Sequence, residues 1–230
     1  MSSRDYIMGR IRWSLGRGAQ QSEPCETLEA RLKSPKANLI PKRGQGTAKE
    51  QRSLFVKQAK GVNATVSRIK SLNNVPKAVA KYLKELGVDQ KVRIAPHEDL
   101  EKLDWSKLDA SFGASEGDDL NGVVMAYGGV AETGSLALLS GAKSPTTLNF
   151  LPDNHIVVLK AEDLVGDYEA VYARMRRDSN SANFMPRAMN WISGPSRTAD
   201  LEQTLLLGAH GPVKLHILLV EDDGEESQIS

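Results

Sequence analysis

The chain has 230 residues, of which 40% are hydrophobic and 26% charged, a composition typical of a soluble globular protein rather than a disordered chain. Its 30 Lys and Arg against 29 Asp and Glu give a formal charge of +1. Residues 1–60 carry 13 basic and 5 acidic side chains, net +8, so residues 61–230 carry 17 basic and 24 acidic side chains, net −7. No apolar run approaches the roughly 20 residues of a membrane-spanning helix, so none is predicted.

Cysteine content excludes several kinds of site. Cys25 is the only cysteine, so one chain forms no intrachain disulfide and supplies neither a Cys-based zinc site nor a Cys-ligated iron–sulfur cluster. No two histidines lie four residues apart, and no metal site is predicted. Residues 1–10 are charged and lack the apolar segment of a secretory signal, so we expect a cytoplasmic protein.

The N-terminal region reads as an arm. Ile7, Ile11 and Leu15 lie four residues apart, which predicts a short amphipathic docking helix over residues 4–15 with a basic outer face. Residues 16–47 contain Gly, Pro and Gln with little periodicity and indicate a linker or extended arm. We therefore divide the chain into a helical and basic arm over residues 1–47, an α/β domain over 48–220 and an acidic tail over 221–230.

The first half of the predicted domain alternates helices and strands. Hydrophobic spacing predicts helices over residues 48–60 and 76–86 and strands over residues 65–69 and 91–94. A helix between two strands is the unit of an α/β sheet. The acidic, turn-rich residues 98–119 are expected to cross the surface.

The second half contains short apolar runs bounded by Gly, Pro, Asn or Asp, which are typical of buried strands. These runs cover residues 122–127, 135–139, 156–159, 191–192 and 214–220. A helical stripe beginning at Leu164 and ending at Met175 predicts one helix, and Ala199–Leu207 a second, with Thr198 as its N-cap and Gly208 as its stop. The predicted fold is α/β, a mainly parallel sheet flanked by helices.

A glycine-rich segment over residues 128–135 separates two of these strands. The backbone and hydroxyls of Thr133, Gly134 and Ser135 could cradle a phosphate or carboxylate, with Glu132 available for proton transfer. The alternative is a tight turn between strands that exposes Glu132. Neither a P-loop nor a dinucleotide fingerprint is present.

A second segment could bind an anion. If Ala199–Leu207 is a helix, Gly194, Ser196, Arg197 and Thr198 stand at its N-terminus, where free N–H groups and a guanidinium favour a carboxylate or phosphate. The alternative is ordinary capping, with Arg197 paired to Asp200.

Histidines differ in their sequence context. His210 is flanked by turn residues, so we predict that it faces a cleft and transfers protons. His155 and His216 begin or interrupt strands, which favours packing or supporting roles over direct contact with a ligand.

The basic N-terminal region has several possible partners. Its cluster consists of Arg31, Lys33, Lys36, Lys42, Arg43 and Lys49. Interleaved aromatic residues and a base-reading motif are missing, so nucleic-acid binding is not predicted. A partner-binding arm is favoured, and a solvated face is the alternative.

Four stretches together resemble one family. They are AETGS at residues 131–135, FLPDNHIVV at 150–158, ISGPSRTADLE at 192–202 and GAHGP at 208–212. They are similar to signature segments of the lactate-utilisation (LUD) domain family, in particular its C subunit. The resemblance implies a fold like that of the NagB/RpiA/CoA-transferase group. It also implies action with two iron–sulfur sister subunits in oxidising L-lactate to pyruvate, with the redox cofactor on those partners.

The leading hypothesis is an accessory or substrate-handling subunit of a lactate-oxidation complex. Its anion pocket would combine Thr133–Ser135, Ser196–Thr198 and His210, with Glu132 or His210 as the catalytic proton carrier. One alternative is a freestanding enzyme of the CoA-transferase or sugar-phosphate isomerase type with Glu132 as nucleophile or base. The other is a non-catalytic assembly or regulatory protein.

Overall fold

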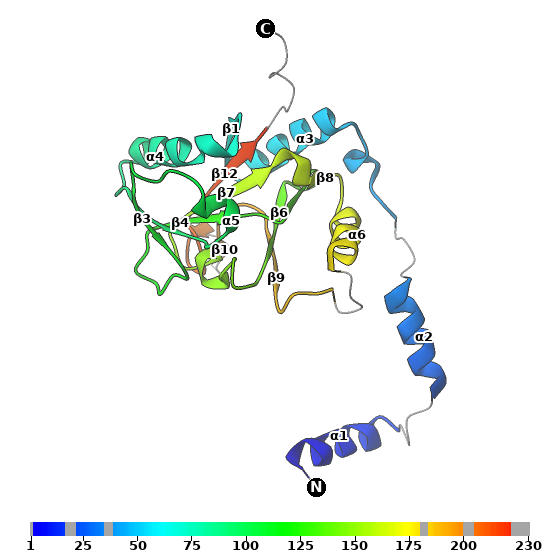
Figure 1. Cartoon of the computed structure of the whole chain (residues 1–230). Coiled ribbons are helices and arrows are strands. Elements are labelled where there is room, and N and C mark those ends of the chain that lie inside the picture. The colour runs from blue at the N-terminus through cyan, green and yellow to red at the C-terminus, as the bar shows by residue number, and fades with distance from the viewer. Residues whose placement is uncertain (1, 17–21, 35–38, 180–183, 200–204, 222–230) are drawn as a thin grey trace. The chain divides into compact units, whose positions relative to one another are not determined.

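A computed structural model describes residues 2–16, 22–34, 39–179, 184–199 and 205–221 (Figure 1). The chain divides into two compact units, Met1–Leu39 and Ile40–Ser230. Within the described ranges, no helix is long and apolar enough to cross a membrane.

The first unit contains two helices, α1 (Ser3–Ser14) and α2 (Ser22–Lys33). The Ser2 hydroxyl accepts the Asp5 N–H and the Asp5 carboxylate accepts the Ser2 N–H, so a capping box starts α1. The helix expected at residues 4–15 is confirmed. The extended arm expected after it is wrong over α2, because Pro24 lies in the first turn, where a missing N–H breaks no helical bond.

The second unit is built on a six-stranded sheet in the order β1-β12-β7-β4-β2-β3, with every neighbouring pair parallel. Figure 1 shows β12, β7 and β4 in the middle of this unit, β1 beside β12 at one edge of the sheet, and α3 and α4 alongside. The strands are β1 (Thr65–Ile69), β2 (Lys91–Ile94), β3 (Asp109–Phe112), β4 (Asn121–Met125), β7 (Asn154–Lys160) and β12 (Lys214–Val220). The predicted parallel α/β fold flanked by helices is confirmed.

Helices of this unit bury apolar stripes against the sheet. The helices are α3 (Ala48–Gly61), α4 (Val75–Leu86), α5 (Glu98–Glu101) and α6 (Tyr168–Ser179). Phe55 and Ala59 of α3 and Leu83 of α4 are fully buried. Gly87 ends α4 at φ 68°, in the left-handed region that glycine tolerates. The stretch 98–119 is more than a surface crossing: it contains α5 and the edge strand β3 and buries Trp105.

A second sheet has the order β8-β5-β6-β9. Its strands are β5 (Gly128–Val130), β6 (Ser135–Leu139), β8 (Leu164–Val165) and β9 (Met189–Ile192). The helix expected from Leu164 begins only at Tyr168. Leu164 and Val165 pair with β5 instead, and the Asp167 carboxylate accepts the Ala170 N–H at 2.9 Å at the helix start.

Residues expected to form the last helix contain strands. Strand β10 (Arg197–Ala199) pairs antiparallel with β11 (Leu205–Leu207). The helix predicted over Ala199–Leu207 is therefore wrong at both ends, and residues 200–204 lie outside the described residues. Thr198 pairs with Leu206, so a strand ladder takes the place of a helix cap.

Two buried asparagines join neighbouring strands. Asn121 and Asn154 are register partners on β4 and β7, and Asn154 Nδ2 donates to Asn121 Oδ1 at 2.9 Å. Asn121 Nδ2 donates in turn to the carbonyls of Asp89 and Lys91. The amide pair therefore satisfies its own buried polar atoms and ties β4 to its neighbours.

Candidate functional site

The turn between β5 and β6 holds a compact hydroxyl network. Ser135 Oγ lies 2.8 Å from Thr133 Oγ1, 2.9 Å from Tyr168 Oη and 2.5 Å from Ser193 Oγ. Thr133 Oγ1 also lies 2.9 Å from Tyr168 Oη. These hydroxyls satisfy one another inside the protein, so Thr133 and Ser135 hold the turn together, and their hydroxyls are already engaged without a ligand.

Gly134 allows this turn to pack against α3. Its φ is 69°, and a Cβ there would lie 2.3 Å from the Ala59 backbone nitrogen. The predicted strand–strand turn is therefore present, closed by a Gly134 N–H to Val130 carbonyl bond of 2.9 Å. Glycine is required here by backbone conformation and by close approach.

Glu132 is buried, contrary to the exposed position expected for a simple turn. Glu132 is 6% exposed, and its Oε2 lies 3.6 Å from Arg43 Nε. Its backbone N–H donates to the Gly166 carbonyl. The carboxylate is thus buried beside Arg43, and its Oε2 has an ion-pair contact but no hydrogen-bond partner.

Arg197 and Thr198 lie on strand β10 and build no helix N-terminus. The Arg197 guanidinium is exposed and donates through Nη2 to the Val62 carbonyl. Gly194, at φ 79°, brings this segment close to the same residue, since a Cβ on it would meet the Val62 carbonyl oxygen at 2.2 Å. The predicted anion clamp therefore has its arginine engaged in joining this loop to the end of α3.

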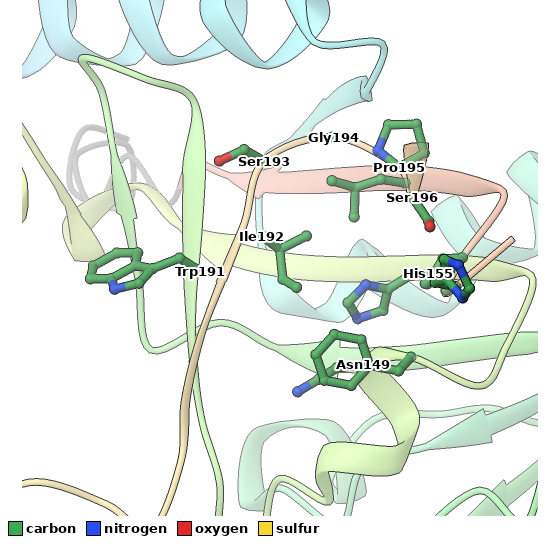
Figure 2. A pocket seen from close by; sticks show the side chains of 13 residues that line it. Asn149, His155, Trp191, Ile192, Ser193, Gly194, Pro195 and Ser196 are labelled. Carbon is green, nitrogen blue, oxygen red and sulfur yellow. The ribbon is translucent and has the colours of Figure 1, made fainter. Parts of the chain in front are cut away.

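A cavity of about 200 Å³ opens at the amino ends of β7 and β12 (Figure 2). It is lined by Asn149, Phe150, His155, Trp191, Ile192, Ser193, Gly194, Pro195, Ser196, His210, Gly211, Pro212 and Leu215. In Figure 2 the side chains of His155 and Ile192 point toward the same space, Asn149 lies next to them, and Trp191 points away. The loop after β9 and the loops that precede β7 and β12 thus form the wall of the cavity.

Two fully buried polar side chains in this cavity have no hydrogen-bond partner. Asn149 is 0% exposed, and both of its amide atoms are unpartnered; His155 is 1% exposed, and both ring nitrogens are unpartnered. Buried polar groups normally find partners, and each unmade bond costs about 1–3 kcal/mol. A group that completes these bonds is therefore expected inside the cavity.

His155 is held neutral. Burial lowers the pKa of its imidazole from 6.5 to about 3, because the charged form is poorly solvated inside the protein. At neutral pH the ring therefore offers one N–H donor and one lone-pair acceptor.

His216 shows the contrasting arrangement. Its Nδ1 lies 2.7 Å from Thr65 Oγ1, and its ring stacks on Tyr82 with centroids 3.9 Å apart. Burial lowers the pKa of His216 to about 4. The packing role predicted for His216 is confirmed, whereas His155 lies buried on the cavity wall without the partners that such a role requires.

The structure separates the predicted site into two groups. Gly194, Ser196 and His210 line the cavity, and His210 is exposed there. The other candidates, namely Glu132, Thr133, Gly134, Ser135, Arg197 and Thr198, do not line it. The two groups are joined by the Ser135 to Ser193 contact. No sequence signal identifies Asn149, and the packing or supporting role predicted for His155 does not explain its unpartnered ring nitrogens.

Comparison with known proteins decides the family. The model of the LUD domain matches residues 52–220, most of the chain. The chain belongs to the LUD domain family. The match starts in α3 and includes every residue that lines the cavity, so the cavity lies within the LUD domain of this chain.

Relatives of this LUD domain protein include proteins named for lactate use. The chain is 34% identical over 101 residues to lactate utilization protein C of Halalkalibacterium halodurans, a match covering 44% of each chain. It is 27% identical over 237 residues to YkgG of Escherichia coli (strain K12), covering 96% of this chain and 100% of the relative. The match to the lactate utilization protein therefore spans less than half of that relative's length.

A solved structure shares the fold. The crystal structure of a DUF162 family protein from Deinococcus radiodurans superposes with a TM-score of 0.55 and 21% identity, covering 76% of this chain and 99% of that one. Segments 150–158, 192–202 and 208–212, which carry the sequence resemblance, each contribute residues to the cavity wall. Within the described residues, no group of three His, Cys, Asp or Glu side chains could hold a metal ion.

Proposed function

We propose that this LUD domain protein binds a small 2-hydroxy or 2-oxo acid, lactate or pyruvate, as a substrate-handling component of lactate utilisation. The observation that carries the proposal is the pair of fully buried, unpartnered side chains, Asn149 and His155, on the wall of one cavity. The lactate utilization relative supports the choice of acid.

The cavity supplies the hydrogen bonds that such an acid needs. Asn149 Nδ2 and the N–H of neutral His155 are donors for a carboxylate, and their remaining acceptors suit the hydroxyl of a 2-hydroxy acid. The described residues that line the cavity include no Lys or Arg, so the acid is held by neutral donors in a partly apolar wall. A volume of about 200 Å³ lies below the roughly 300–1,000 Å³ of sites for drug-sized molecules and suits a three-carbon acid.

Proton transfer falls to His210. This imidazole lines the cavity and is exposed, so it can exchange a proton between the cavity and solvent, whereas His155 stays neutral. Removing two electrons from lactate requires an acceptor that side chains do not provide. In this proposal iron–sulfur sister subunits in the cytoplasm supply that acceptor, as the family resemblance implies.

Calorimetric titration of the full chain with L-lactate and pyruvate tests the proposal. Asn149→Leu should weaken binding of the preferred acid about tenfold or more, because it removes two donors and an acceptor from a buried site. Asn190→Leu is the matched control, since Asn190 Nδ2 is also buried and unpartnered but does not line the cavity. Absence of binding by the unchanged protein, or equal loss in both variants, would overturn the assignment.

A further inference from the structure

A second cavity, of about 420 Å³, opens at the other end of the strands of the parallel sheet. It is lined by Ala48, Arg52, Leu72, Lys160, Ala161, Glu162 and Val220. Lys160 ends β7 and Val220 ends β12, so the cavity lies over the carboxyl ends of two adjacent parallel strands. It shares no lining residue with the cavity beside His155.

Three neighbouring strands, β1, β12 and β7, contribute to this cavity at or just after their carboxyl ends, through Leu72, Val220 and Lys160. Strand β12 lies between β1 and β7. The chain leaving β1 passes Leu72 and crosses through α4 to β2, toward the β3 edge, whereas the chain leaving β7 next enters this sheet at β12, toward the β1 edge. The cavity therefore lies outside the carboxyl ends of the parallel strands, the end at which open α/β sheets bind ligands.

The two cations in this cavity differ in their partners. Lys160 Nζ lies 2.8 Å from Asp99 Oδ2 and 3.9 Å from Glu162 Oε1, so it is already paired. Arg52, half-buried on α3, forms no hydrogen bond or ion pair with any residue that the structure describes. A guanidinium presents a planar fork of N–H donors that matches the oxygens of phosphate or carboxylate.

We propose that this cavity binds an organic phosphate of the nucleotide class, with its phosphate on Arg52 and its base against the apolar wall. Leu72, Ala161 and Val220 supply that wall. The volume lies within the roughly 300–1,000 Å³ of small-molecule sites and is about twice that of the His155 cavity. This site is independent of the proposed acid site.

The test is calorimetric titration of the full chain with ADP, adenosine and inorganic phosphate. ADP should bind more tightly than either fragment, because only ADP engages both the guanidinium and the apolar wall. Arg52→Gln should weaken ADP binding about tenfold. Arg52→Lys keeps the charge but loses the planar fork of donors, so its ADP affinity should lie between those of the unchanged protein and Arg52→Gln.

Lys57→Gln is the matched control, since it removes one positive charge from an exposed position of the same helix. It should change ADP affinity by less than about twofold, because an exposed charge that does not line the cavity is screened by salt. Absence of ADP binding would overturn the proposal, as would equal loss in Arg52→Gln and Lys57→Gln, which would indicate diffuse charge attraction. Lactate binding serves as a separate readout, because failure at one site leaves the other intact.

Discussion

The β5–β6 turn and the cavity beside His155 both contain polar side chains inside the protein, but they differ in whether those side chains are hydrogen-bonded. In the turn, Ser135 and Thr133 complete their hydrogen bonds with Tyr168 and with one another. In the cavity, Asn149 and His155 are more deeply buried than Thr133, yet their polar atoms have no partner. The hydroxyls of the turn therefore stabilise the fold, whereas the polar atoms of Asn149 and His155 are available to hydrogen-bond a ligand.

The largest expected effect is on the turn. Gly134→Ala should lower the free energy of unfolding by roughly 3 kcal/mol, because the new Cβ meets the α3 backbone at a residue with positive φ. Urea denaturation measures the change. Gly141→Ala is the control, since nothing lies within 4 Å of its Cβ position and its φ is not positive; similar losses in both variants would show that the turn is not specially constrained.

His155 should make the free energy of unfolding depend on pH. The folded-state pKa of His155 is lowered to about 3 from 6.5, so the unfolded chain binds its proton first as pH falls. The free energy of unfolding therefore drops below pH 6.5, by roughly 2 kcal/mol for this residue between pH 6.5 and 5. His155→Leu should remove that part of the pH dependence in urea titrations at both pH values, and an unchanged dependence would mean that His155 titrates normally.

The smallest expected effect is that of Ser135→Ala, which should lower stability without a comparable change in lactate binding. Ser135→Ala should cost about 1 kcal/mol, because three hydroxyls lose a buried neighbour. Lactate affinity should change much less than in Asn149→Leu, since Ser135 does not line the cavity. Ser53→Ala, at an exposed position of α3, provides the stability control. A larger effect on binding than on unfolding would place the turn within the binding site.

Much of the fold could be predicted from local pattern. The apolar run at 214–220 coincides with β12, and the spacing over 76–86 lies within α4. The predictions failed where long-range pairing competes with local preference. Thr198 followed by acidic residues is typical of a helix start, yet its backbone pairs with Leu206. Leu164 pairs with β5 although it begins a helical stripe.

The site was harder to predict because residue type does not reveal hydrogen-bond partners. His155 and His216 both occur in apolar strand contexts, and only the structure shows that Thr65 and Tyr82 contact one of them. Glycine in the GAHGP segment correctly indicated a turn beside a cavity. The carbonyl that engages Arg197 comes from Val62, 135 positions away in the chain, which no local motif could indicate.

The asparagine pair across β4 and β7 has a consequence for folding specificity. A shift of one residue between these strands would separate Asn154 Nδ2 from Asn121 Oδ1 and leave both amides buried without each other. The hydrogen bond between the two amides thus favours a single register of β4 and β7. That register places His155, the next residue on β7, beside the cavity.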